Sequence, residues 1–146
     1  MTAQTQQFQY EHDTWKRVLY HMMDENVHFK LRLSEILKSR SDKKFIAKAE
    51  LFQHRFIKFD EHLFKLRNQL VTLEKNINNG AAEEIIMELK LSFETLRKHM
   101  ASAERQLIRS RINFICYLNK ISNADPIRNV LSGLNKEVLS GMNESE

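Results

Sequence analysis

Residues 45–77 read FIAKAELFQHRFIKFDEHLFKLRNQLVTLEKNI and carry the strongest structural signal in the sequence. Apolar side chains recur along this stretch in alternating steps of four and three residues, without interruption. The positions are Phe45, Ala49, Phe52, Phe56, Phe59, Leu63, Leu66, Leu70, Leu73 and Ile77. This spacing places them on one face of an α-helix, as at the a and d positions of a heptad repeat. The stretch therefore predicts a long helix that packs on other helices by coiled-coil-like contacts.

The segments on either side carry the same heptad seam. One seam runs from Ala82 to Ile121, and another runs from Phe8 to Ile36 with two polar members, His12 and Asn26. We interpret Asn26 as a buried amide that fixes the register of the helices. Because His12 lies near the fraying start of the first helix, we expect its side chain to be exposed to solvent.

Two short breaks separate these periodic segments, SRSD at 39–42 and NNG at 78–80. A glycine after a helix accepts the left-handed backbone of the C-terminal cap. We therefore predict long helices over 6–39, 42–78 and 81–122. Connections this short make consecutive helices antiparallel.

Residues 123–146 have a weaker pattern. Asp125 and Pro126 suit an N-cap and the first helical position, and apolar residues then keep a helical spacing as far as Met142. We predict a short fourth helix near 126–142. The expected fold is all-α: an antiparallel up-down bundle of three long helices over 1–122, with a short C-terminal fourth helix in the same domain.

Composition narrows the class of protein. A chain of 146 residues suits a single domain, and its three Gly and one Pro leave few turns for strands. The single cysteine, Cys116, cannot form an internal disulfide, which argues for a reducing compartment. The N-terminus does not resemble a secretory signal, and no segment is apolar enough to span a bilayer. We expect a soluble, cytoplasmic protein without membrane insertion.

The histidines offer a candidate metal site. Glu25 and His28 have the Glu-x-x-His spacing of half a di-iron site, but the sequence does not repeat it, and the heptad register turns the pair away from the seam. A second candidate set is His21, His62 and His99. The connections set residue 21 level with about 60 and residue 60 level with about 99, so these three imidazoles share one height. We favour their interpretation as partly exposed polar flanks over that as metal ligands, and we predict no metal and no cofactor.

The sequence carries no motif for catalysis. It has no Gly-rich phosphate loop, no Gly-x-Ser-x-Gly and no paired-cysteine motif. Cys116 has no histidine nearby in the sequence to act as its base. We therefore expect a protein that is not an enzyme.

Lysine and arginine are unevenly distributed. Residues 30–58 carry nine of them against three acids, and residues 97–120 carry six against one. The expected topology brings these segments to one end of the bundle, as a basic pole. Its candidate binding residues are Lys43, Lys44, Lys48, Arg105, Arg109 and Arg111. A basic surface attracts nucleic acid, another polyanion or an acidic protein, although Lys and Arg also serve simply to solvate long helices.

A second apolar line runs along the predicted middle helix, off its seam. Ile57, Phe64 and Val71 follow one another at sevenfold spacing. A three-helix core uses the a and d positions, and an uncovered apolar line on a soluble protein marks an interface, so we predict a homodimer. The sequence favours a non-catalytic interaction or adaptor protein that binds a protein partner through this line and the basic pole. A nucleic-acid-binding protein and a metal-binding bundle are the alternatives.

Overall fold

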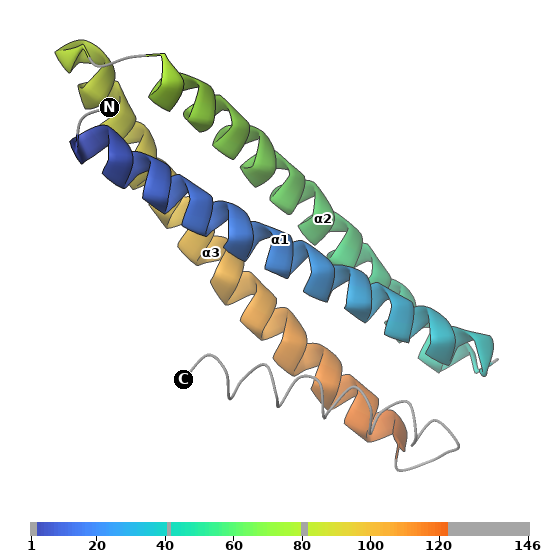
Figure 1. The fold of residues 1–146 in the computed structure, drawn as a ribbon. Helices are drawn as coiled ribbons and strands as arrows, with labels where there is room; N and C mark the ends of the chain where they lie inside the picture. Colours follow the sequence, from blue (N-terminus) through green and yellow to red (C-terminus); the bar gives the residue numbers. More distant parts are fainter. Residues whose placement is uncertain (1–2, 41, 80–81, 123–146) are drawn as a thin grey trace. The chain divides into compact units, whose positions relative to one another are not determined.

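The computed structural model describes residues 3–40, 42–79 and 82–122. They form three α-helices and no strand: α1 spans Ala3–Lys38, α2 spans Lys43–Asn78 and α3 spans Glu83–Ser122 (Figure 1). The predicted helices begin and end within three residues of these bounds, so the all-α class with three long helices is confirmed. The predicted fourth helix near 126–142 lies outside the described residues.

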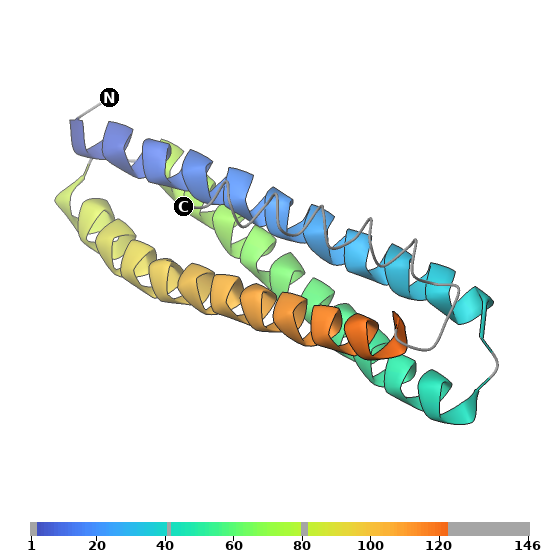
Figure 2. The ribbon, with the colours of Figure 1, turned by 90° about the horizontal axis from the view of Figure 1, so that it is seen from below.

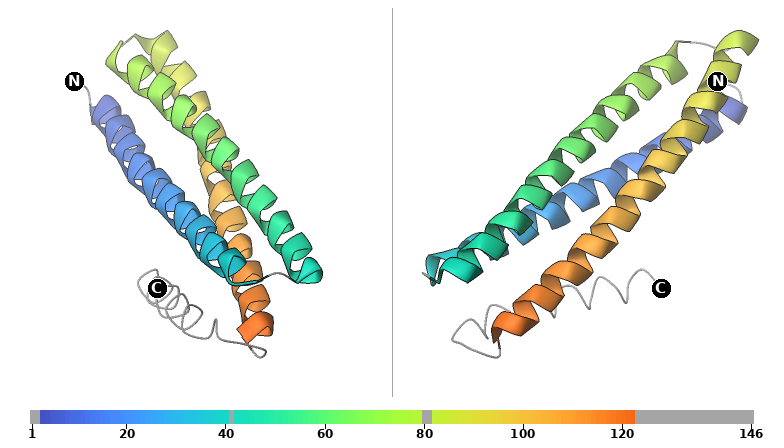
Figure 3. Two further views of the ribbon diagram at one scale, coloured as in Figure 1. Left: turned by 90° about the vertical axis from the view of Figure 1, so that its right-hand side faces the viewer. Right: turned by 180° about the vertical axis from the view of Figure 1, so that it is seen from behind.

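Each helix is continuous because neither glycine nor proline interrupts it, and the views in Figure 2 and Figure 3 show the unbroken ribbons from other sides. Asp42 begins α2: its side-chain Oδ1 accepts a hydrogen bond from the backbone N–H of Lys44 at 3.1 Å, as an N-cap residue does. Glu83 and Glu84 occupy the first turn of α3, where carboxylates offset the positive end of the helix dipole.

The chain forms two compact units, and each contains part of all three helices. Among the described residues, unit 1 comprises 3–26, 58–79 and 82–107, and unit 2 comprises 27–40, 42–57 and 108–122.

In unit 1, α1 and α3 are joined by aromatic rings and an ion pair. The rings of Phe8 and Phe93 stack with centroids 4.7 Å apart, and Trp15 lies 5.2 Å from Phe93. The Arg97 guanidinium donates two hydrogen bonds to the carboxylate of Glu11, at 3.0 and 3.1 Å. Along these contacts the residue numbers of α1 and of α3 increase in the same direction, so the two helices run parallel in unit 1.

In unit 2, the core is a cluster of aromatic side chains from all three helices. Phe56 meets Phe114 edge to face with centroids 5.1 Å apart, and both rings contact Phe29 of α1. Tyr117 lies 4.8 Å from Phe52. Edge-to-face and offset ring pairs add to the stabilisation that burial of the rings provides.

The heptad seam of α2 is buried over its whole length. All ten predicted positions, from Phe45 to Ile77, are core residues, which confirms the seam. The α3 seam is buried from Leu89 onward, except for the half-buried Ser110. At the start of α3, Ala82 is exposed and Ile86 is half-buried.

Candidate functional site

The two polar members of the α1 seam are both buried in unit 1. Asn26 is fully buried, as predicted, and its Nδ2 donates a 2.7 Å hydrogen bond to Oδ1 of Asp60 on α2. The expectation that His12 is exposed to solvent is wrong, because its side chain is 1% exposed. Its Nε2 lies 2.9 Å from the backbone oxygen of Leu70, which can only accept, so Nε2 carries the proton.

The second ring nitrogen of His12 explains an electrostatic effect at the surface. Nδ1 of His12 lies 3.2 Å from Oδ1 of Asp13, and Nε2 of Gln9 donates to the same oxygen at 2.9 Å. Because a carboxylate oxygen accepts, Nδ1 donates this hydrogen bond only when it carries a proton as well as Nε2, as in the imidazolium. This bond, followed by that from Gln9, lowers the pKa of Asp13. His12 therefore links a buried backbone acceptor of α2 to an exposed carboxylate of α1.

The register between α2 and α3 differs from the one expected. Residue 60 was predicted to lie level with about 99, but in unit 1 the partner of His99 is Gln69, whose Oε1 lies 3.3 Å from His99 Nδ1. In unit 2, Phe56 meets Phe114, which follows the same register. A heptad seam repeats every seven residues, so it fits two registers that differ by one heptad equally well.

This register also accounts for the start of α3. When the register of the Gln69–His99 contact is extended toward the start of α3, α2 ends at Asn78, before the level of Ala82 and Ile86. These two seam positions lack α2 residues opposite them and are therefore less buried than Leu89.

The three candidate metal ligands all lie in unit 1, but the structure places them in different environments. His21 is exposed, whereas His62 and His99 are half-buried. Burial, followed by repulsion from His99 and Lys65, lowers the pKa of His62. The Nε2 atom of His62 has no hydrogen-bond partner among the described residues. Within 3–40, 42–79 and 82–122, no three His, Cys, Asp or Glu side chains converge as metal ligands.

The six candidate residues of the basic pole are divided between the two units. Lys43, Lys44, Lys48, Arg109 and Arg111 lie in unit 2, and Arg105 lies in unit 1.

The expectation that these lysines and arginines share one height is wrong within unit 2. Phe45, which follows Lys44, stacks on Tyr117 with centroids 5.8 Å apart. Tyr117 lies eight residues beyond Arg109, or roughly 12 Å along the helix axis. The cause is again the register, which moves the start of α2 toward the end of α3.

Charge nevertheless separates by unit. The described residues of unit 2 contain 11 Lys and Arg against three Asp and Glu, a net charge of +8. Those of unit 1 contain ten against 12, a net charge of −2. Because the units are defined by contacts and not by charge, the contrast is a property of the fold, and the described residues of unit 2 carry the excess of positive charge.

The predicted apolar line on α2 is exposed. Ile57, Phe64 and Val71, which we call the α2 apolar line, are 45%, 53% and 45% exposed. The guanidinium of Arg67 lies over the Phe64 ring, 5.6 Å from its centroid. A shallow hollow of about 460 Å³ beside this ring is lined by Asp60, Glu61, Phe64 and Lys65.

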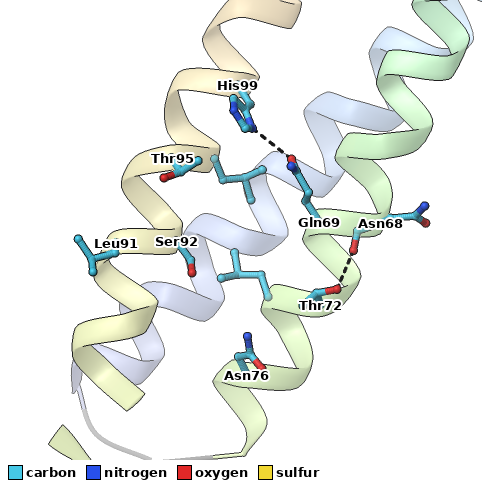
Figure 4. A pocket seen from close by; sticks show the side chains of 10 residues that line it. Asn68, Gln69, Thr72, Asn76, Leu91, Ser92, Thr95 and His99 are labelled. Atoms are coloured by element: carbon cyan, nitrogen blue, oxygen red, sulfur yellow. Dashed lines mark hydrogen bonds between the residues drawn. The ribbon is translucent and has the colours of Figure 1, made fainter. Parts of the chain in front are cut away.

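A groove between α2 and α3 of unit 1 was not predicted (Figure 4). It measures about 480 Å³, and its lining residues are Asn68, Gln69, Thr72, Leu73, Asn76, Leu91, Ser92, Thr95, Leu96 and His99. None is an Asp, Glu, Lys or Arg, although 22 of the 72 described residues in unit 1 are. The groove therefore offers amides, hydroxyls and leucine side chains without a formal charge.

The signal for this groove was present in the heptad pattern. Gln69, Asn76, Ser92 and His99 occupy g positions, which flank each other across an antiparallel pair. Figure 4 shows Gln69 and His99 pointing toward each other across the groove. Finding it from sequence requires the α2–α3 register, which the seam leaves ambiguous.

These observations define an all-α protein of three long helices whose candidate sites are exposed surfaces of those helices. Within the described residues, no helix has a stretch apolar enough to cross a bilayer. The chain belongs to the Blo t 5 mite allergen family, whose model matches residues 34–136. No curated protein and no solved structure matches the chain. The family description names an allergen and gives no reaction, ligand or partner.

Proposed function

We propose that this protein is a non-catalytic interaction protein that self-associates through the α2 apolar line. The observation that carries the proposal is the exposure of Ile57, Phe64 and Val71, each about half in water. Every seam position of α2 is buried at the same time, so the core does not need these three side chains. Apolar side chains aligned on one helix face lose unfavourable contact with water when a second apolar surface covers them.

Light scattering tests this proposal directly. We expect the protein at tens of micromolar to scatter with twice the 17.4 kDa mass of one chain. Phe64→Glu places a charge in the centre of the line, so its mass should fall to that of one chain. Met87→Glu is the matched control: Met87 is an exposed apolar residue of α3 in unit 1, and this variant should keep the parent mass. A parent protein that scatters as a single chain contradicts the proposal.

A second candidate function is polyanion binding by unit 2, and the net charge of +8 on its described residues favours it. Lys43, Lys44 and Lys48 are exposed at the start of α2, and Arg109 is exposed on α3. Because the register separates these groups along the helices, the proposed contact is extended. An extended duplex or single strand suits it better than a small anion.

A salt titration of binding to a DNA oligonucleotide tests the second candidate. Each phosphate neutralised by the protein releases counterions, so the affinity should fall steeply with salt concentration. Lys44→Glu combined with Lys48→Glu should weaken binding and flatten the slope. Lys16→Glu combined with Arg17→Glu, in unit 1, makes the same change in net charge and should have a smaller effect. Equal losses in the two double variants mean that only net charge matters.

A further inference from the structure

We infer that two copies of this chain associate through a face that α1 and α2 form together, in which Tyr20 of α1 extends the α2 apolar line. The inference rests on the proposed self-association and assigns the second helix of its surface. The position of Tyr20 follows from the contacts between the helices in unit 1. These contacts set the side of α1 on which the ring lies and its level along α2.

The α2 apolar line borders α1 and not α3. In unit 1, Asp60 accepts a hydrogen bond from Asn26 of α1, so it marks the α1 side of α2. Gln69 contacts His99 of α3 and marks the opposite side. At about 3.6 residues per turn, Phe64 lies about 40° around the helix from Asp60 and about 140° from Gln69. The exposed Phe64 ring therefore lies on the outer side of α2, next to α1.

Tyr20 occupies the matching position on α1. His12 is hydrogen-bonded to the backbone of α2 and marks the α2 side of α1. Glu11 pairs with Arg97 and marks the α3 side. The exposed Tyr20 lies about 80° around the helix from His12 and about 180° from Glu11. Tyr20 therefore projects, like Phe64, from the outer face that α1 and α2 share in unit 1.

The contacts of α1 with α2 also set the level of Tyr20. Residue numbers fall along α2 as they rise along α1, because the two helices run in opposite directions. Counted from the bond to Asp60, Tyr20 lies level with a point two residues after Phe64. Counted from the bond to the Leu70 backbone, it lies level with a point two residues before Phe64. The two rings therefore share one level of unit 1.

The same arrangement recurs in unit 2. Val27 follows Tyr20 by seven residues, and Ile57 precedes Phe64 by seven. The rings of Phe29 and Phe56 lie 5.6 Å apart, which sets Val27 level with the residue after Ile57. Both Val27 and Ile57 are exposed. In each unit, α1 therefore adds an exposed apolar side chain at the level of one member of the α2 apolar line.

The area that a dimer needs favours a surface on two helices. A half-exposed aromatic ring offers about 100 Å², since a whole ring buries about 150–250 Å². The three residues of the α2 apolar line therefore offer at most roughly 300 Å², well below the ~800 Å² that each partner buries in a specific interface. Self-association through this line requires a neighbouring helix, and Tyr20 and Val27 show that α1 supplies apolar side chains on the same side.

The charges around the two rings favour a second copy as the partner. Three bases and three acids surround the rings, so their formal charges sum to zero. A strongly acidic or basic partner gains nothing from such a surface, whereas two copies of it do not repel each other. The residues three or four positions away are Lys16, Arg17, Met23 and Asp24 around Tyr20, and Asp60, Glu61, Arg67 and Asn68 around Phe64.

Tyr20→Glu tests the inference by light scattering at tens of micromolar. The substitution places a carboxylate on the α1 part of the face, so the mass should fall to the 17.4 kDa of one chain, as for Phe64→Glu. His21→Glu is the matched control. His21 is the next residue of the same helix and is also exposed, but it lies about 100° further around α1, toward α3. This variant should keep the parent mass.

Thiol labelling gives a readout that adds no charge and does not disrupt the dimer. The background is Cys116→Ser, which removes the exposed free thiol. The thiol of Tyr20→Cys should react with a maleimide several-fold faster when the protein is diluted until it scatters as a single chain. The thiol of His21→Cys should react at nearly the same rate at both concentrations. Equal rates for Tyr20→Cys at the two concentrations overturn the inference.

The outcomes separate this inference from the proposed function. If Phe64→Glu scatters as a single chain and Tyr20→Glu keeps the parent mass, the inference is overturned and self-association through the α2 apolar line stands. If His21→Glu dissociates as readily as Tyr20→Glu, a charge on either side of α1 is sufficient, and the inference is again overturned. A parent protein that scatters as a single chain overturns both proposals, because no second copy then covers the face.

Discussion

Replacing His12 by alanine should lower the free energy of unfolding far more than the same replacement of an exposed histidine. His12 is 1% exposed, and its Nε2 donates a 2.9 Å hydrogen bond to the backbone oxygen of Leu70. The variant loses about 1 kcal/mol from the buried hydrogen bond, and the cavity left by the imidazole adds to this loss. Together these effects predict a loss of about 2–4 kcal/mol in the free energy of unfolding.

Urea denaturation of the parent, His12→Ala and His21→Ala measures this difference. All three should be compared at one protein concentration, because self-association contributes to apparent stability. With a denaturant slope of about 1.5 kcal/mol per molar, the midpoint for His12→Ala should fall by roughly 1–3 M. His21 is an exposed histidine on the same helix, and its replacement should cost less than about 0.5 kcal/mol. Equal, small effects of the two substitutions would refute the buried position of His12.

Three further predictions concern the two cores. Burial raises the pKa of Tyr117 to about 12, above its ordinary value of 10.0, so the fold favours the neutral phenol. Stability to denaturant should therefore decline as pH rises from 10 toward 12, and Tyr117→Phe should lack this part of the decline. Phe56→Ala should lose about 3–5 kcal/mol of thermodynamic stability in denaturant titrations, against less than about 0.5 kcal/mol for the exposed Lys58→Ala. Asn26→Ala should cost about 1–3 kcal/mol in the same assay, because it removes the hydrogen bond that the fully buried Asn26 donates to Asp60.

The fold class and the helix positions could be predicted because local and tertiary signals agree. The α2 stretch places ten apolar residues on one face and contains no glycine or proline, so a helix is favoured locally and is buried on the same face. The exposure of Ile57, Phe64 and Val71 follows from the same periodicity, since residues at b positions lie away from a three-helix core.

The position of His12 could not be predicted because its hydrogen-bond partner is distant in the sequence. Leu70 follows it by 58 residues, and the acceptor is a backbone oxygen that has no residue-specific signature. A polar residue at a seam position near the start of a helix is compatible with a frayed end and with a buried, bonded side chain. Only the partner decides between them. The resulting bond makes His12 part of the unit 1 core.

The register of α2 against α3 shows a limit of periodic sequences. A repeat that is regular enough to establish the helices is equally compatible with registers one heptad apart, so apolar spacing alone does not determine which polar residues meet. Because of that ambiguity, the expected register placed Lys43, Lys44 and Lys48 level with Arg109, whereas the structure separates them along the helices. For the same reason the groove beside Gln69 was not predicted. The outer face of α2 differs from the seams because its charges do not repeat every seven residues: Asp60, Arg67 and Glu74 follow one another at sevenfold spacing with alternating sign. A one-heptad shift along this face therefore changes the sign of the charge that a partner surface would meet, whereas the same shift along the seams changes no apolar contact.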